Sequence, residues 1–139
     1  DLRYRHFEEK PVPITKAVVF CEMDVSGSMD EETRKRAKIF FWLLQHFLKM
    51  KYEHVDIVYI RHTDVAEEVD EETFFDTDKS GGTRVSSIHE KKKEIIPERY
   101  PPAQWNIFGA HASDGDNAYD DNKYCCDLLR ELLPGMQAY

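Results

Sequence analysis

The chain has 139 residues, of which 41% are apolar, and its formal net charge is −8 at pH 7. This length fits one domain with a single core. The negative charge argues against non-specific nucleic-acid binding, because a phosphate backbone repels an acidic surface. No apolar run approaches the roughly 20 residues of a membrane span, and the charged start DLRYRHFEEK is unlike a signal peptide. The three cysteines show no CxxC spacing, so we expect a reduced, cytoplasmic protein.

The first part of the chain predicts an extended lead-in, a strand and a long helix. Residues 1–15 are polar and contain PVP, which favours an extended segment. Residues 16–24, KAVVFCEMD, are typical of a strand buried on both faces of a parallel sheet. Residues 30–50 have apolar side chains at helical spacing, nearly all round in the middle turns. This helix should be deeply packed or meet a partner. Its predicted core residues are Phe40, Phe41 and Trp42.

The central part predicts a hairpin and a second helix. Two strands, 55–61 and 64–69, are separated by so few residues that they must be antiparallel. A glycine-containing loop, FFDTDKSGGTRVSS, then leads to a helix at about 85–96, which Pro97 and the later prolines close. The run EKKKE, residues 90–94, is predicted to be an exposed face of this helix.

The last part predicts another buried strand, QWNIFGAHA, followed by the loop SDGDN and a helix at about 118–133 that stops at PG. The acids near the start of this helix, Asp116, Asp120 and Asp121, are expected to be solvated. The tail GMQAY is expected to begin a further strand that the chain does not complete.

Strands that alternate with helices predict an α/β fold with a doubly wound, mostly parallel sheet, one antiparallel edge strand and helices on both faces. In such sheets ligands bind beyond the carboxyl ends of the strands, where neighbouring connections leave on opposite faces. Three loops should lie at that edge: residues 24–29, 78–84 and 113–117.

These loops carry side chains that share one property, since all of them offer oxygen as a ligand atom. They are Asp24, Ser26, Ser28, Thr83 and Asp114. Hard divalent cations such as Mg²⁺ select oxygen ligands and keep several waters. In the D-x-S-x-S spacing, alternate residues that leave a strand can point to one side, while Gly27 supplies tight curvature. The sequence therefore predicts a Mg²⁺ or Mn²⁺ site at this edge.

Simpler interpretations of two of these loops stand beside the metal site. Ser28 and Glu31 fit a capping box at the start of the long helix, and SDGDN fits an Asx-type turn. The rival function is a Mg²⁺-dependent phosphatase that uses Asp24. Its D-x-D pattern requires a second acid at Ser26, so no general acid is in place.

The motifs DVSGSM, SGGT and SDG together resemble the metal-ion-dependent adhesion site of the von Willebrand factor type A domain. The resemblance implies that five residues surround Mg²⁺ or Mn²⁺ and that an Asp or Glu of a partner protein completes the coordination. Those five are Asp24, Ser26, Ser28, Thr83 and Asp114. It assigns residues 16–139 to such a domain, apparently without its C-terminal strands, and implies a binding module rather than an enzyme.

Longer stretches, among them HTDVAEEVDEETFF and RYPPAQWNIFGAHASDGDN, resemble the bacterial YeaH/YhbH family, which is associated with stress and sporulation. This resemblance implies a link to a PrkA-type serine kinase pathway. The charge and the lack of a long apolar run predict no nucleic-acid and no membrane partner. It also implies that further segments flank the domain.

Overall fold

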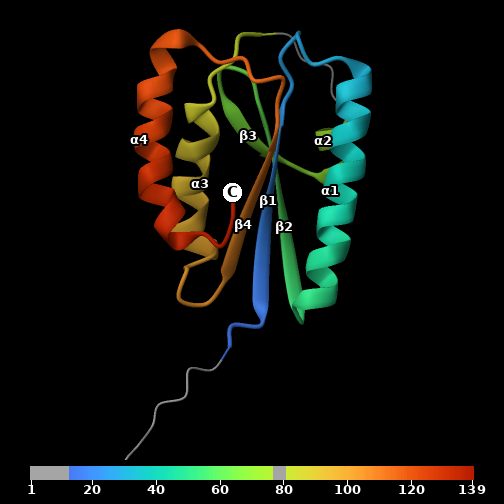
Figure 1. Cartoon of the computed structure of the whole chain (residues 1–139), viewed down its shortest axis with the longest axis vertical. Helices are drawn as coiled ribbons and strands as arrows, with labels where there is room; N and C mark the ends of the chain where they lie inside the picture. The colour runs from blue at the N-terminus through green and yellow to red at the C-terminus, as the bar shows by residue number, and fades with distance from the viewer. Residues whose placement is uncertain (1–12, 77–80) are drawn as a thin grey trace, which may run out of the picture.

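The chain folds as a four-stranded sheet with helices packed on both of its faces (Figure 1). The computed structural model describes residues 13–76 and 81–139. The strands are β1 (Lys16–Asp24), β2 (His54–His62), β3 (Ala66–Val69) and β4 (Asn106–Ala112). The α-helices are α1 (Glu31–Lys51), α2 (Glu71–Asp76), α3 (Ser86–Arg99) and α4 (Asn122–Leu132), and the 3-10 helices are η1 (Tyr119–Asp121) and η2 (Leu133–Gly135). Most of the expected lead-in and residues 78–80 of the second loop lie outside the described residues.

The sheet has the strand order β3-β2-β1-β4, which confirms the predicted fold class. Strand β1 pairs in parallel with β2 on one side and with β4 on the other. Strand β3 is antiparallel to β2, as the short link between them requires. Since β1 is central, its residues from Ala17 to Asp24 are all buried, in agreement with its almost continuous apolar run.

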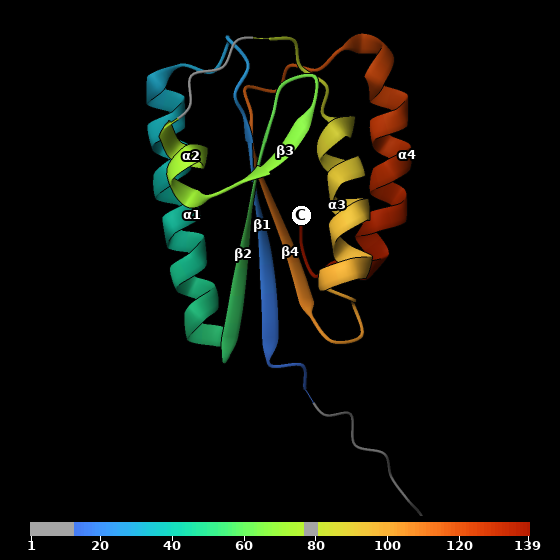
Figure 2. The same cartoon turned by 180° about the vertical axis from the view of Figure 1, so that it is seen from behind.

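Alternate side chains of the sheet feed two separate hydrophobic cores, because successive residues of a strand point to opposite faces. On one face Val18 and Phe20 pack with Ile88 of α3. On the other face Val19 and Cys21 pack with residues of α1 and α2. Figures 1 and 2 show the corresponding layers, with α3 and α4 on one side of the sheet and α1 and α2 on the other.

Two helix boundaries differ from the sequence-based expectation. Helix α1 is capped by Asp30, whose side chain accepts the Thr33 N–H at 2.7 Å, so the expected capping box at Ser28 is wrong. Helix α3 runs through Pro97 and ends at Arg99. A proline removes one hydrogen-bond donor, and here the final turn continues past it. Helix α2 was not expected. It begins where the Asp70 side chain accepts the Thr73 N–H at 2.7 Å.

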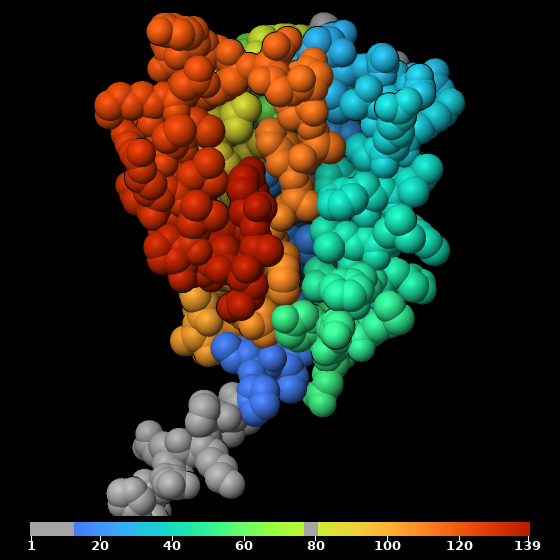
Figure 3. All heavy atoms as spheres, in the orientation of Figure 1, coloured from blue at the N-terminus to red at the C-terminus, as the bar shows by residue number. Residues whose placement is uncertain are grey.

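The burial of several side chains also corrects the sequence analysis. Phe41 is in the core, but Phe40 is 52% exposed and Trp42 is 58% exposed, so their predicted core positions are wrong. Helix α1 is apolar on two sides, and within the described residues only its inner side is covered. Figure 3 shows its side chains projecting along one flank of the molecule. Conversely, Lys92 lies in the run expected to be exposed and is fully buried.

The tail runs back beside β4, as expected for the start of a further strand. The Gln137 N–H donates to the Ile107 carbonyl at 2.7 Å, and the Gly109 N–H donates to the Ala138 carbonyl at 2.9 Å. These bonds form a parallel bridge between Phe108 and Ala138.

Candidate functional site

Three loops meet at the carboxyl ends of β1 and β4, and we call them the rim: residues 24–29, 81–84 and 113–117. The chain leaves the carboxyl end of β1 towards α1 on one face of the sheet and leaves the carboxyl end of β4 towards α4 on the other face. Connections that diverge in this way leave a crevice between the two strands. The rim lies at the upper end of the molecule in Figure 1.

The first loop is organised around the carboxylate of Asp24, which is fully buried at the end of β1. Its Oδ1 accepts the Ser26 N–H at 2.8 Å, which closes a tight turn. The hydroxyl oxygens of Ser26 and Ser28 then lie 3.1 Å apart. Because Asp30 caps α1, the Ser28 hydroxyl is not used as the helix cap.

The third loop contributes two residues to the same network. The Ser113 hydroxyl donates to Asp24 Oδ2 at 3.4 Å, a contact that the sequence analysis did not anticipate. Asp114 is exposed, and a hydrogen bond from Ser28 followed by one from the Asp116 N–H holds the pKa of its carboxyl below the usual range. The second of these bonds is the expected Asx-type turn, with Gly115 at φ 90°.

Thr83 is placed at the rim by its backbone. Its carbonyl accepts the Ala118 N–H at 3.1 Å, and the neighbouring Arg84 N–H donates to the Thr63 carbonyl at 2.9 Å. Thr83 is half-buried. The structure therefore links Asp24 to Ser26 through the Ser26 N–H, and Ser26 to Ser28 through their hydroxyls, while Asp114 interacts with Ser28. Within the described residues, Thr83 is connected to the rim only through the backbone of its loop.

The start of α3 is tied to the third loop and to the start of α4. The Val85 N–H donates to Asn117 Oδ1 at 3.0 Å, and the Ser86 N–H donates to Asp121 Oδ2 at 2.9 Å. Asp121 is 2% exposed, so its predicted solvation is wrong. Burial alone would raise the pKa of this carboxyl, but the Ser86 hydrogen bonds lower it below its ordinary value. These contacts hold the second and third loops together.

Two histidines lie beneath the rim. His62, at the end of β2, pairs in register with Asp24, and its Nε2 lies 3.0 Å from His111 Nε2 on β4. Burial lowers the pKa of His62, although the nearby Asp24 carboxylate opposes this shift. Burial also lowers the pKa of His111 to about 3. Both rings are therefore neutral at physiological pH, and neither supplies a positive charge to Asp24.

A second buried polar group lies below the rim and includes Glu22, two residues before Asp24 on β1. Glu22 and Lys92 are both fully buried, and Glu22 Oε1 lies 2.8 Å from Lys92 Nζ. The Tyr139 hydroxyl donates to Glu22 Oε2 at 2.8 Å, and the Lys92 ammonium lies 3.8 Å from the centre of the Tyr139 ring. The sequence analysis did not predict this group. Glu22 lies in a strand of mostly apolar residues, and Lys92 lies in a charged run that suggests an exposed helix face.

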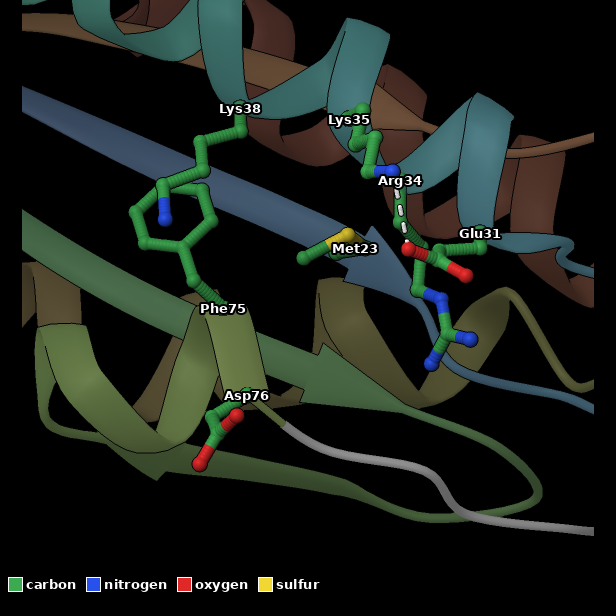
Figure 4. Close-up of a pocket in the computed structure, with 7 residues that line it drawn as sticks. All are labelled: Met23, Glu31, Arg34, Lys35, Lys38, Phe75 and Asp76. Carbon is green, nitrogen blue, oxygen red and sulfur yellow. Dashed lines mark ion pairs between the residues drawn. The ribbon is translucent and has the colours of Figure 1, made fainter.

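Away from these groups, a pocket of about 320 Å³ lies between α1 and α2 (Figure 4). The Lys35 ammonium in this pocket pairs with Glu31 at 2.8 Å. The Lys38 ammonium lies 5.0 Å from the centre of the Phe75 ring. Two of the cations that line the pocket thus already contact neighbouring side chains, and the pocket carries no functional assignment.

Residues 13–76 and 81–139 lack two further features, a cluster of metal-binding side chains and a membrane-spanning helix. These residues contain no group of three or more His, Cys, Asp or Glu side chains that could hold a metal ion. The rim contributes only two carboxylates among its proposed ligands, and the others are hydroxyls. None of the described helices combines the length and the hydropathy needed to cross a membrane.

The fold and the rim define an α/β domain with an oxygen-lined edge at its topological switch point. The chain belongs to the family described as "Protein of unknown function (DUF444)", whose family model matches residues 1–139. A UPF0229 protein of Serratia proteamaculans is 53% identical over 140 residues, and one of Vibrio parahaemolyticus is 54% identical over 140 residues. Each alignment covers 100% of this chain and 33% of the relative, so the chain spans about a third of their length. These matches support the expected YeaH/YhbH-like family.

Proposed function

We propose that this domain is a metal-dependent protein-binding module of the von Willebrand factor type A kind. In this proposal Mg²⁺ or Mn²⁺ is held at the rim, and an acidic side chain of a partner protein completes the coordination. The ligands from this chain are Asp24, Ser26, Ser28, Thr83 and Asp114. We further propose that the module acts in bacterial stress or sporulation signalling with a PrkA-type kinase pathway as the partner system, a role that the YeaH/YhbH resemblance implies.

The observation that carries the proposal is the environment of Asp24. Its carboxylate is fully buried, and within the described residues it has no ion pair; its closest polar contacts are an N–H and a hydroxyl. A buried carboxylate without a cationic partner is costly. A divalent cation bound between Asp24 and the adjacent hydroxyls would compensate this charge, and the donor set consists entirely of oxygen.

One side of the rim is buried and the other is exposed, which supports access of a partner protein to a bound cation. Asp24 and Ser26 are buried, whereas Ser28 and Asp114 are exposed. A cation held between them would face solvent on one side. Because the proposed set has only two carboxylates, it would neutralise the cation without an excess of negative charge that repels an acidic side chain, so a partner's carboxylate could still bind the cation.

In this proposal Thr83 is the ligand that exchanges, because within the described residues no side-chain hydrogen bond links it to the other four ligands. Its hydroxyl would reach the cation either through a bridging water or after a shift of the second loop. Exchange between these two arrangements would change the number of direct ligands, and therefore the affinity for the cation and for the partner's carboxylate.

The test of the proposal is stabilisation of the folded protein by the metal. Binding to the folded state alone stabilises by about 1.4 kcal/mol when the free metal is ten times Kd. We expect a rise in Tm of about 3–6 °C with saturating Mg²⁺ or Mn²⁺, and its loss in Asp24→Asn. The matched control is Asp116→Asn, since Asp116 is exposed and the bond that it makes to Asp114 comes from its backbone N–H. An unmodified protein whose Tm does not respond to either metal would exclude the proposal.

The phosphatase alternative has no supporting observation in the site. The residue two positions after Asp24 is Ser26, and its hydroxyl contacts Ser28 instead of an acid that could protonate a leaving group. Mg²⁺-dependent hydrolysis of p-nitrophenyl phosphate that disappears in Asp24→Asn would reverse this preference.

A further inference from the structure

The buried ion pair between Glu22 and Lys92 joins two elements that carry the rim. Glu22 precedes Asp24 by two residues on β1, so both side chains lie on the same face of the sheet. Lys92 comes from α3, whose first turn directly follows Thr83 and Arg84. The pair therefore connects the strand that ends in Asp24 with the helix that positions the second loop.

Stability alone does not account for such a pair. Removing two charges from water costs several kcal/mol per ion, and replacing a buried ion pair with apolar side chains is often neutral or stabilising. Lys92 and Glu22 are both fully buried, and in the part of the chain that the structure describes Tyr139 is the only further hydrogen-bonding partner of the carboxylate. The best-attested use of buried polar groups is to select one register between packed elements.

The contacts around the pair show what depends on the position of α3 along the sheet. If α3 slid along the sheet by a turn, an apolar contact could re-form, but Lys92 would lose Glu22 and remain buried without a partner. The start of α3 also holds the third loop, through the bonds from Val85 to Asn117 and from Ser86 to Asp121. The axial position of α3 therefore determines where both the second and the third loop lie relative to Asp24.

We propose that Glu22 and Lys92 are positioning residues whose ion pair sets the spacing of the three rim loops, and thereby the affinity of the rim for a divalent cation. This inference rests on the proposed function of the rim. Neither residue contacts the cation. Their effect arises because a rim assembled from separate elements binds tightly only when its oxygens are held within a few tenths of an ångström.

The test uses variants that remove the ion pair without changing the net charge. In Glu22→Gln/Lys92→Met both side chains keep their approximate size, and Gln still accepts the Tyr139 hydroxyl. We expect the variant to fold and to bind Mn²⁺ at least about tenfold more weakly, as is typical when supporting contacts around a metal site are removed. Titration calorimetry measures Kd, at a temperature where near-UV circular dichroism shows native packing.

The matched control removes a different ion pair from the same helix. Lys93 pairs with Glu131 of α4 at the surface. Lys93→Met/Glu131→Gln makes the same type of change one residue along α3, and its affinity for Mn²⁺ should remain that of the unmodified protein. A loss of affinity in this control equal to that in the buried pair would contradict a specific positioning role.

Other results of these measurements would refute either the proposed function or the positioning role of the ion pair. If the unmodified protein binds no Mn²⁺, the proposed function fails and this inference fails with it. If it binds Mn²⁺ and Glu22→Gln/Lys92→Met folds and binds equally well, only the positioning role is overturned. If that variant does not fold, Glu22→Leu/Lys92→Met/Tyr139→Phe repeats the test with an apolar core. Failure of both variants to fold would make the pair a requirement for folding and would refute the inference.

Discussion

Gly109 lies where the ring of Tyr139 crosses β4. A Cβ built at this glycine would lie 2.3 Å from Cδ2 of the Tyr139 ring and 3.0 Å from the end of Met136. The absence of a side chain thus allows Tyr139 to reach Glu22 on the neighbouring strand. Here one residue type determines whether the buried polar group beneath the rim can form.

Gly109→Ala should therefore destabilise the fold, by about 1–3 kcal/mol, because the ring must move or the strand must bend. Chemical denaturation measures this loss. In the double variant Gly109→Ala/Tyr139→Ala the clash is absent, so the combined loss should be smaller than the sum of the two single losses. Strictly additive losses would show that the ring and the glycine do not interact.

At the scale of elements, α1 carries two adjacent phenylalanines with opposite environments. Phe41 is fully buried and its ring centre lies 5.5 Å from that of Phe74, whereas Phe40 is 52% exposed. The helix is apolar on both sides, so periodicity shows that it is helical but does not show which side faces the sheet. Its outer side is an apolar surface of the kind that marks contacts in other proteins.

The two phenylalanines provide a matched pair of substitutions. Phe41→Ala should lower the free energy of unfolding by about 3–5 kcal/mol, since it leaves a cavity between α1 and the sheet. Phe40→Ala should change it by less than about 1 kcal/mol, because the side chain is half exposed. Urea denaturation of both variants distinguishes the two sides of the helix. Similar losses would mean that the outer side of α1 is also covered.

At the scale of the whole molecule, the interior contains several titratable groups that fold in their neutral form. His89 on α3 is fully buried, and burial together with the neighbouring Lys92 lowers the pKa of its ring to about 3. Neither of its ring nitrogens has a hydrogen-bond partner among residues 13–76 and 81–139. In the unfolded chain a histidine has a pKa near 6.5, so the unfolded state binds a proton that the folded state excludes.

The fold should consequently lose stability on acidification. The contribution of His89 is complete above pH 6.5 and declines as the pH falls towards 3, by up to about 1.4 kcal/mol per pH unit. Tm measured from pH 7.5 to 5 should fall less steeply in His89→Leu than in the unmodified protein. Parallel curves would show that His89 is not excluded from protonation in the folded state.

Local patterns in the sequence predicted the four strands, the helices α1, α3 and α4, and the fold class, but not α2. The apolar run of residues 16–24 predicted a central parallel strand, the short link after β2 predicted the antiparallel hairpin, and the alternation of strands and helices predicted the layers. They also predicted which loops meet at one edge of the sheet, because that follows from connectivity alone. Asp24, Ser26, Ser28 and Asp114 were expected at this edge, and in the structure they are connected through the Ser26 N–H, the two serine hydroxyls and the Asp114 carboxylate.

Tertiary packing decided the features that depend on neighbours distant in sequence. Lys92 lies in a charged run and Asp121 at an acidic helix start, yet both are buried because Glu22 and Ser86 lie opposite them. Phe40 follows the apolar pattern and is exposed, because the sheet covers only one side of α1. A pattern along the chain records the preference of each residue for water or the interior. Only the packed elements determine which residues find a partner that makes burial of a charge possible.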